Sequence, residues 1–307
     1  MPTPADLAEK FALPDHVSFE PGSGGLTRAV LKTARAEVHV YTYGAHVTHF
    51  ALAGQAPVLF MSAASAFSPG KPIRGGVPIC FPWFGPRAKD PLAATGGASP
   101  MHGFARLTEW EVESTSALSN NVTITLVLRA TEATRALWPH EFTARYTVTL
   151  AGDTLDLALS VVNGDDQPIE YEEALHTYFA VADVRQIRIE GLDGRTFIDK
   201  TDALARKPQA GDVTITAETD RVYLDTQRAL TIHDPGHNRR IVNAKGSSDV
   251  TVVWNPWTAK AKAMADFGDD EWPAMVCVET CNVGDHKVKL PPGGVHHTRA
   301  TIGVEAS

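Results

Sequence analysis

The chain is poor in cysteine. Its 307 residues contain three, Cys80, Cys277 and Cys281. An odd and low count is typical of a protein in the reducing cytosol. If Cys277 and Cys281 share a strand, a rise of about 3.3 Å per residue places them roughly 13 Å apart, too far for a disulfide or a shared metal ion. We expect these thiols to behave as small buried hydrophobes.

The chain also lacks long apolar runs and an excess of basic residues. No stretch approaches the roughly 18 apolar residues of a membrane-spanning helix, and residues 1–6 show neither the basic nor the apolar region of a secretory signal. The formal net charge of -8 argues against nucleic acids and anionic membranes as general partners. We therefore expect a cytoplasmic protein, in which a few placed arginines would have to hold any small anionic ligand.

Alternation of apolar and polar side chains is the dominant local pattern. Residues 142–150 alternate without a break, Gly152-Asp153 marks a turn, and residues 155–161 resume the alternation, which predicts a β-hairpin. A short helix is predicted at 5–11 and a helical turn at 133–137. Many short strands with few helices predict an all-β fold, an antiparallel sandwich or barrel. The further strands are predicted at 37–43, 122–129, 187–190, 213–217, 229–233 and 250–254.

Glu279 is the most informative single residue. It lies in the run 275–281, which otherwise has the pattern of a buried strand, and it shares a face with Cys277 and Cys281. A carboxylate among thiols is costly unless it is paired or takes part in chemistry. His176 interrupts a second strand-like run. Together they suggest a carboxylate base and an imidazole acid on a β-scaffold, the alternatives being a structural ion pair and a satisfied core histidine.

Two irregular segments carry further polar residues. Prolines and glycines exclude regular structure over 71–87, and a flexible stretch leads into His102 and Arg106. Arg74 precedes Gly75-Gly76, so its guanidinium and the neighbouring backbone N–H groups could hold a phosphate. His102 and Arg106 flank a glycine and could hold oxygens of a polar ligand. The alternatives are an ordinary surface arginine and a surface turn.

Two more residues could contact a ligand. Trp257 is a candidate ligand wall, and Asp225 could accept hydrogen bonds from hydroxyl groups, although core packing and an exposed strand edge are nearly as good interpretations. The twelve histidines include no HExxH motif, and no paired CxxC motif predicts a metal ion. The chain has no GxSxG nucleophile elbow and no GxGxxG loop after a strand.

Five motifs follow one another along the chain and carry a family resemblance. In them the chain resembles the aldose 1-epimerase (mutarotase) superfamily, and within it the hexose-6-phosphate mutarotase branch (glucose-6-phosphate 1-epimerase). One such motif would be weak, but five in the family's order are specific, and they extend over about residues 25 to 303. The motifs are Ile73-Arg74-Gly75-Gly76-Val77-Pro78 with Phe81-Pro82, His102-Gly103-Phe104-Ala105-Arg106, Glu173-Ala174-Leu175-His176-Thr177-Tyr178-Phe179, Trp254-Asn255-Pro256-Trp257 and Val278-Glu279.

The resemblance implies a large antiparallel β-sandwich (the galactose mutarotase-like supersandwich) with few short helices. Residues 23–305 would form this single domain, after an N-terminal extension over 1–22. The resemblance also implies that His176 is a general acid and Glu279 a general base, with no metal and no organic cofactor. We expect a monomer or weak homodimer. The expected substrate contacts are Arg74, His102, Arg106, Asp225 and Trp257.

The implied activity is interconversion of the α and β anomers of a hexose 6-phosphate, with glucose 6-phosphate as the first candidate, by opening and reclosing the sugar ring. Arg74 and Arg106 favour the phosphorylated sugar, and Arg87 and Lys89 stay open as further phosphate ligands. Two alternative functions also stay open. One is 1-epimerisation of unphosphorylated aldoses, and the other is non-catalytic binding of a sugar phosphate on the same fold.

Overall fold

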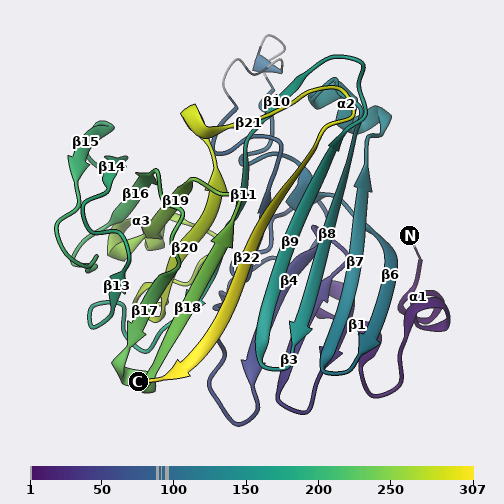
Figure 1. Cartoon of the computed structure of the whole chain (residues 1–307), viewed down its shortest axis with the longest axis horizontal. Helices are drawn as coiled ribbons and strands as arrows, with labels where there is room; N and C mark the ends of the chain where they lie inside the picture. Colours follow the sequence, from purple (N-terminus) through teal and green to yellow (C-terminus); the bar gives the residue numbers. More distant parts are fainter. Residues whose placement is uncertain (1, 88–89, 91, 94–96) are drawn as a thin grey trace.

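The computed structural model describes residues 2–87, 90, 92–93 and 97–307. Lys89, a candidate phosphate ligand, lies outside these residues. Antiparallel strands make up most of the described chain, and its helices are short, which confirms the predicted all-β class (Figure 1). None of the helices in the described part is long and apolar enough to cross a membrane.

Two eight-stranded sheets form the body of the molecule. The β20 sheet has the order β15-β14-β16-β19-β20-β11-β5, with β12 also paired to β20, and the β22 sheet has the order β13-β17-β18-β22-β9-β8-β7-β6. The β20 sheet comprises β5 (Ile79–Cys80), β11 (Glu173–Leu175), β12 (Tyr178–Ala180), β14 (Thr196–Asp199), β15 (Ala205–Pro208), β16 (Thr219–Leu224), β19 (Val250–Asn255) and β20 (Met275–Asn282). The β22 sheet comprises β6 (Glu111–Leu118), β7 (Asn121–Arg129), β8 (Phe142–Ala151), β9 (Thr154–Asn163), β13 (Arg188–Glu190), β17 (Leu230–Asp234), β18 (Arg239–Gly246) and β22 (Val295–Ala306).

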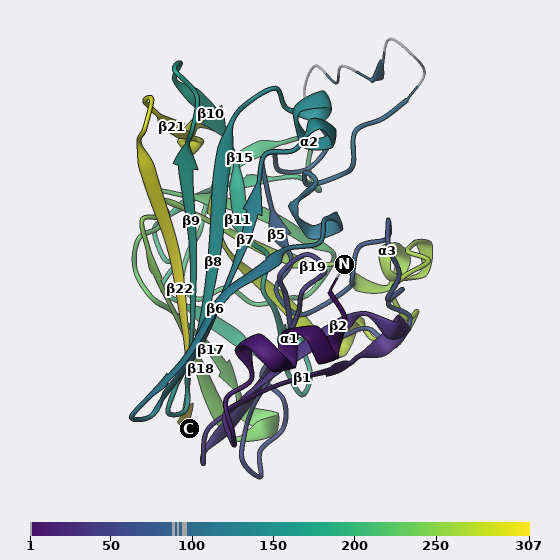
Figure 2. The ribbon, with the colours of Figure 1, turned by 90° about the vertical axis from the view of Figure 1, so that its right-hand side faces the viewer.

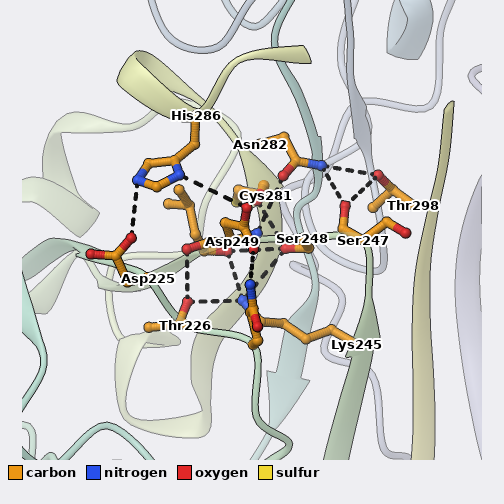
Figure 3. Close-up of polar contacts among 12 residues, drawn as sticks. Asp225, Thr226, Lys245, Ser247, Ser248, Asp249, Cys281, Asn282, His286 and Thr298 are labelled. Carbon is orange, nitrogen blue, oxygen red and sulfur yellow. Dashed lines mark hydrogen bonds and ion pairs between the residues drawn. The ribbon is translucent and has the colours of Figure 1, made fainter. Parts of the chain in front are cut away.

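Polar contacts as well as apolar packing join the two sheets. Lys245 of β18 crosses the interface and donates from Nζ to the hydroxyls of Thr226 and Thr251, at 2.9 Å each (Figure 3). Burial lowers the pKa of Lys245 to about 8. Asn243 of the same strand donates to the carbonyl of Val278 at 3.3 Å. These contacts hold β19 and β20 against the β22 sheet.

The predicted hairpin is present as β8 and β9, whose register pairs Phe142 with Asn163 and Ala151 with Thr154. Alternate residues of β8, among them Ala144, Tyr146 and Val148, are buried because they point into the main hydrophobic core. The prediction of a strand at 213–217 is wrong. Val213 forms an isolated bridge with Ile189, and no ladder continues from it because no neighbouring strand runs beside the following residues.

The N-terminal residues pack against the rest of the chain. Helix α1 (Pro4–Phe11) begins at a capping box formed by Thr3 and Asp6 and buries Leu7, as the short helix predicted at 5–11 requires. Figure 2 shows α1 lying along β1 (Val17–Pro21), and Leu7 and Val17 belong to the main core cluster. A four-stranded sheet joins β1 to β2 (Thr27–Lys32), β3 (Ala36–Tyr41) and β4 (His46–Leu52).

The remaining elements are small. Strands β10 (Ile169–Tyr171) and β21 (Val288–Leu290) form a two-stranded sheet. The segment predicted as a helical turn at 133–137 lies in a short helix, α2 (Glu132–Leu137), and a third helix, α3 (Trp257–Ala263), follows β19.

The loop between β4 and β6 is anchored by aromatic packing. Phe81 is fully buried and its ring meets the rings of Trp138, Phe142 and Tyr171 edge-on, at centroid distances of 5.5, 5.3 and 5.2 Å. Gly103 lies against this anchor with φ of 76°, and a Cβ there would be 2.0 Å from the Phe81 carbonyl oxygen. Only glycine allows this approach, which fixes the position of its neighbour His102.

Candidate active site

A cavity of about 280 Å³ lies on the β20 sheet. Four of the predicted site residues line it: Arg74, His102, His176 and Glu279. Arg106, Asp225 and Trp257 are not among its lining residues. The other lining side chains include Phe84, Met101, Tyr178, Lys200, Asp220, Trp254, Lys260 and Met264.

The register of the β20 sheet builds the floor of the cavity. Asp220 pairs with Trp254, Trp254 with Cys277, and Cys277 with Tyr178, so these side chains form one row across four strands. Glu279 lies two residues beyond Cys277 on β20 and therefore points to the same face. The sheet thus brings an acid, an aromatic ring and a phenol to one surface.

His176 and Glu279 meet in this cavity although a hundred residues separate them in the sequence. His176 Nε2 lies 3.4 Å from Glu279 Oε1, and the two side chains are 10% and 1% exposed. The imidazole stacks on the ring of Tyr178, with centroids 4.8 Å apart and planes 10° apart. On the other side of Glu279, the thiol of Cys281 lies 3.9 Å from Oε2.

Burial favours the neutral form of both groups. It raises the pKa of Glu279 well above its usual value, while the charge of Lys200 acts in the opposite direction. Burial, reinforced by His102 and Arg106, lowers the pKa of His176 well below its usual value. In the state that burial favours, the pair holds one proton, on Glu279, beside a neutral His176.

The buried carboxyl of Glu279 has a cost in stability that depends on pH. In the unfolded chain Glu279 ionises above its usual pKa of 4.5, whereas the folded protein keeps it protonated to higher pH. At pH values between the unfolded-state and the folded-state pKa of Glu279, the folded protein binds one more proton than the unfolded chain. The stability of the folded state therefore falls as pH rises through this range. Glu279→Gln removes this titration. We expect the variant to gain melting temperature relative to the parent as pH rises from 5 to 8.

Thermal unfolding without sugar, measured across that pH range, checks this expectation. Glu113→Gln, the same substitution on β6 of the other sheet, is the matched control. Glu113 is partly exposed and paired with Arg145. If the difference in melting temperature between Glu279→Gln and the parent stays constant with pH, the assignment of a raised pKa to Glu279 is wrong.

His102 presents a hydrogen-bond donor to the cavity. Its Nδ1 accepts from the backbone N–H of Gly85 at 3.2 Å. Burial, with the charges of Arg106 and Lys200, lowers the pKa of His102 to about 3, so the ring is neutral and its hydrogen lies on Nε2. The ring meets those of Phe84 and His176 edge-on, at centroid distances of 4.7 and 5.7 Å.

Three cations line the cavity. Arg74 is held by Asp266, whose Oδ2 accepts from Nε and Nη2 at 3.2 and 2.9 Å, and by the hydroxyl of Tyr178 at 3.0 Å. Lys200 is less firmly paired, since its Nζ lies 3.7 Å from Asp220 Oδ1. Lys260 lies 3.1 Å from Glu218 Oε1. Of these three cations, Arg74 is the one that the sequence predicts as a substrate contact.

Arg106 does not line the cavity. Its side chain is buried, and Nη2 donates to the carbonyl of Met101 at 2.7 Å. Nε has no hydrogen-bond partner in the described part of the chain. The positive charge of Arg106 still influences the cavity, since it lowers the pKa values of His102 and His176. Arg87 also lies outside the lining; its guanidinium covers the ring of Trp83 and donates to the carbonyl of Leu137.

Asp225 and Trp257 occupy other positions. Asp225 follows β16 with φ of 56°, its side chain is 75% exposed, and it faces His286 at 3.6 Å (Figure 3). Trp257 begins α3 and packs on the ring of Trp272, with centroids 4.2 Å apart. The cavity is lined instead by Asp220, five residues before Asp225, and by Trp254, three residues before Trp257.

The fold and the site define a galactose mutarotase-like β-sandwich with an imidazole–carboxyl pair in a cavity on the β20 sheet. The aldose 1-epimerase family model matches residues 28–302. The chain therefore belongs to the aldose 1-epimerase family.

Two curated relatives and one solved structure give the likeness in detail. A protein of Cenchrus ciliaris named "putative glucose-6-phosphate 1-epimerase" is 38% identical over 280 residues, 88% of this chain and 82% of the relative. A protein of Escherichia coli K12 with the same name is 39% identical over 240 residues, 77% of this chain and 76% of the relative. The crystal structure of a "putative mutarotase" from Salmonella typhimurium superposes with a TM-score of 0.87 at 32% identity, covering 97% of this chain and 96% of that one.

Proposed function

We propose that this protein interconverts the α and β anomers of a hexose 6-phosphate, with glucose 6-phosphate as the first candidate. One observation carries the proposal: His176 Nε2 and Glu279 Oε1 lie 3.4 Å apart in a cavity that is also lined by Arg74 and Lys200. The relatives' names and the family support the same activity.

The reaction suits an acid and a base placed side by side. Glu279 takes the proton of the C1 hydroxyl, and His176 gives a proton to the ring oxygen. The C1–O5 bond then breaks with its electron pair on O5, and the C1–O1 bond becomes the aldehyde carbonyl. Rotation about C1–C2 presents the other carbonyl face, and reversal of both proton transfers closes the ring with the anomer inverted. Both oxygens are bonded to C1 in the ring form, so the two protein groups must be adjacent.

The number of protons shared by His176 and Glu279 matches this mechanism. Anomerisation consumes no net proton, and the pair already holds one. The charges of Lys200 and Arg106 lower the pKa of Glu279 and so favour its carboxylate form. A bound phosphate dianion would stabilise the imidazolium of His176 by charge attraction. Substrate binding would therefore shift the shared proton to the group that acts as acid.

The lining supplies separate contacts for the two parts of the substrate. Arg74, Lys200 and Lys260 are the cations available to a phosphate, and Arg74 is pre-positioned by its bonds to Asp266 and Tyr178. Trp254 offers an apolar surface to a sugar ring. His102 and Asp220 supply a donor and an acceptor for ring oxygens and hydroxyls.

The two neighbouring aspartates give a matched test of the hydroxyl contact. Asp220→Asn should lower kcat/KM for the sugar about 10-fold to 100-fold, because a hydrogen bond to a charged group contributes about 1.5–3 kcal/mol. Asp225→Asn should leave it unchanged, because Asp225 is exposed and outside the cavity. Values of kcat/KM for both variants check this contrast, and an equal loss in the two would remove Asp220 from the sugar site.

NMR exchange spectroscopy between anomers tests the function itself. The full chain should speed exchange of glucose 6-phosphate well above the rate in buffer, and far more than it speeds exchange of glucose at equal concentration. Faster exchange of glucose would favour a 1-epimerase of free aldoses. Binding of glucose 6-phosphate without faster exchange would identify a non-catalytic sugar-phosphate binder. We place the protein in the cytoplasm, in keeping with its three free thiols. We also propose that it is a monomer or weak homodimer.

A further inference from the structure

A second cluster of ligating side chains lies on the four-stranded sheet, which contributes no residue to the cavity. Glu37 and His39 are two residues apart on β3 and so share a face, and His39 pairs directly with His49 on β4. One ligand atom from each of the three lies within 4.8 Å of the other two. No other group of histidine, cysteine and carboxylate side chains in the described residues meets this spacing.

We propose that Glu37, His39 and His49 form a binding site for a divalent transition-metal ion, with Zn²⁺ as the best match. Two imidazoles and one carboxylate are ligands that Zn²⁺ takes together, with water in the fourth position. Mg²⁺ and Ca²⁺ prefer oxygen ligands and would bind weakly here. The proposal is independent of the anomerase function.

The strand register holds the three ligands close together before any ion binds. The His39 and His49 rings have centroids 4.6 Å apart, and His39 Nε2 lies 2.5 Å from Glu37 Oε1. His49 makes no side-chain hydrogen bond in the part of the chain that the structure describes. All three residues are half-buried, so a metal ion would lose only part of its hydration on entering.

Two cations border the site and limit its affinity. Lys32 Nζ lies 2.9 Å from Glu37 Oε2, and Arg28 Nη1 lies 3.4 Å from His39 Nδ1. When Zn²⁺ binds His39 Nε2, the single hydrogen of the neutral imidazole moves to Nδ1, which can then no longer accept a hydrogen bond from Arg28. Arg28 must then turn away, toward Glu20, with which it is already paired. Removal of the Arg28 charge should therefore strengthen metal binding, a signature that unconnected surface histidines would not show.

Calorimetric titration of the full chain with ZnCl₂, with MgCl₂ as a parallel probe, tests the site. We expect one Zn²⁺ per chain, binding at least tenfold weaker in His39→Ala and in His49→Gln, and unchanged in His16→Ala, a partly exposed histidine beside β1. Arg28→Gln should bind more tightly than the parent. Zn²⁺ should also raise the melting temperature of the parent but not of the ligand variants.

Anomer exchange by each variant serves as the folding control, because none of these residues lines the cavity. Zn²⁺ binding that survives both histidine substitutions, or no heat of binding with 100-fold excess ZnCl₂, would overturn the proposal. Failure of the metal site would leave the proposed anomerase function untouched, since the two readouts are separate.

Discussion

Glu279→Gln is expected to slow anomer interconversion by about 10²–10⁴-fold, the range that a positioned acid–base group contributes. The amide keeps the size of the carboxyl but cannot take the proton of the C1 hydroxyl. The side chain is 1% exposed, so little bulk water reaches it to act as base in its place. Affinity for glucose 6-phosphate should stay close to that of the parent, because the phosphate contacts are unchanged.

The measurement is the NMR exchange rate at saturating sugar, with affinity from calorimetry. Glu113→Gln on the other sheet again serves as the matched control and should exchange anomers at the parent rate. A Glu279→Gln protein that equilibrates anomers at the parent rate would exclude Glu279 as the base. Loss of affinity in parallel with rate would instead indicate that Glu279 mainly holds the substrate.

Loss of a cavity cation should impair catalysis on the phosphorylated sugar far more than on the free sugar. Arg74→Ala and Lys200→Met are each expected to raise KM for glucose 6-phosphate about 10-fold to 100-fold, since a charge-assisted hydrogen bond to phosphate contributes about 1.5–3 kcal/mol. Glucose has no phosphate to lose, so its low exchange rate should change little. Lys200→Met is the milder variant, because the ion pair that it breaks, with Asp220 at 3.7 Å, is longer than the 2.9 Å pair of Arg74 with Asp266.

Lys207→Met provides the control for Lys200→Met. Lys207 lies on β15 of the same sheet, paired with Asp199 at 2.7 Å, and does not line the cavity. Its removal should leave both sugars unaffected. Equal losses for glucose and glucose 6-phosphate in Arg74→Ala would take Arg74 out of the phosphate site, and the same pattern in Lys200→Met would do so for Lys200.

The parts of the fold that sequence predicts well are those with strong local patterns. The β8–β9 hairpin follows from unbroken alternation and a Gly-Asp turn. The segment at 213–217 has a similar pattern yet forms a single bridge, because a strand exists only where a partner strand lies beside it. Alternation shows which face of a segment is apolar, but it does not show whether another strand lies beside that segment.

The same distinction explains which site residues sequence reasoning finds. Glu279 stands out because a carboxyl interrupts an apolar strand, and His176 stands out in the same way. Asp220 lies between Thr219 and Arg221 like any surface aspartate, and only the cross-strand pair with Trp254 places it over the cavity. Lys200 follows β14, and no pattern in the sequence around it predicts a role in the site. Residues whose role depends on strand register therefore require the three-dimensional structure.

The central claim is that His176 and Glu279 act together on one hexose. The most direct measurement is the anomer exchange rate of His176→Asn, Glu279→Gln and the double variant, each at saturating glucose 6-phosphate. Two groups that share one proton transfer cycle should give a double variant about as slow as the slower single variant. If the two losses multiply instead, the imidazole and the carboxyl group act independently, and the proposed mechanism is wrong.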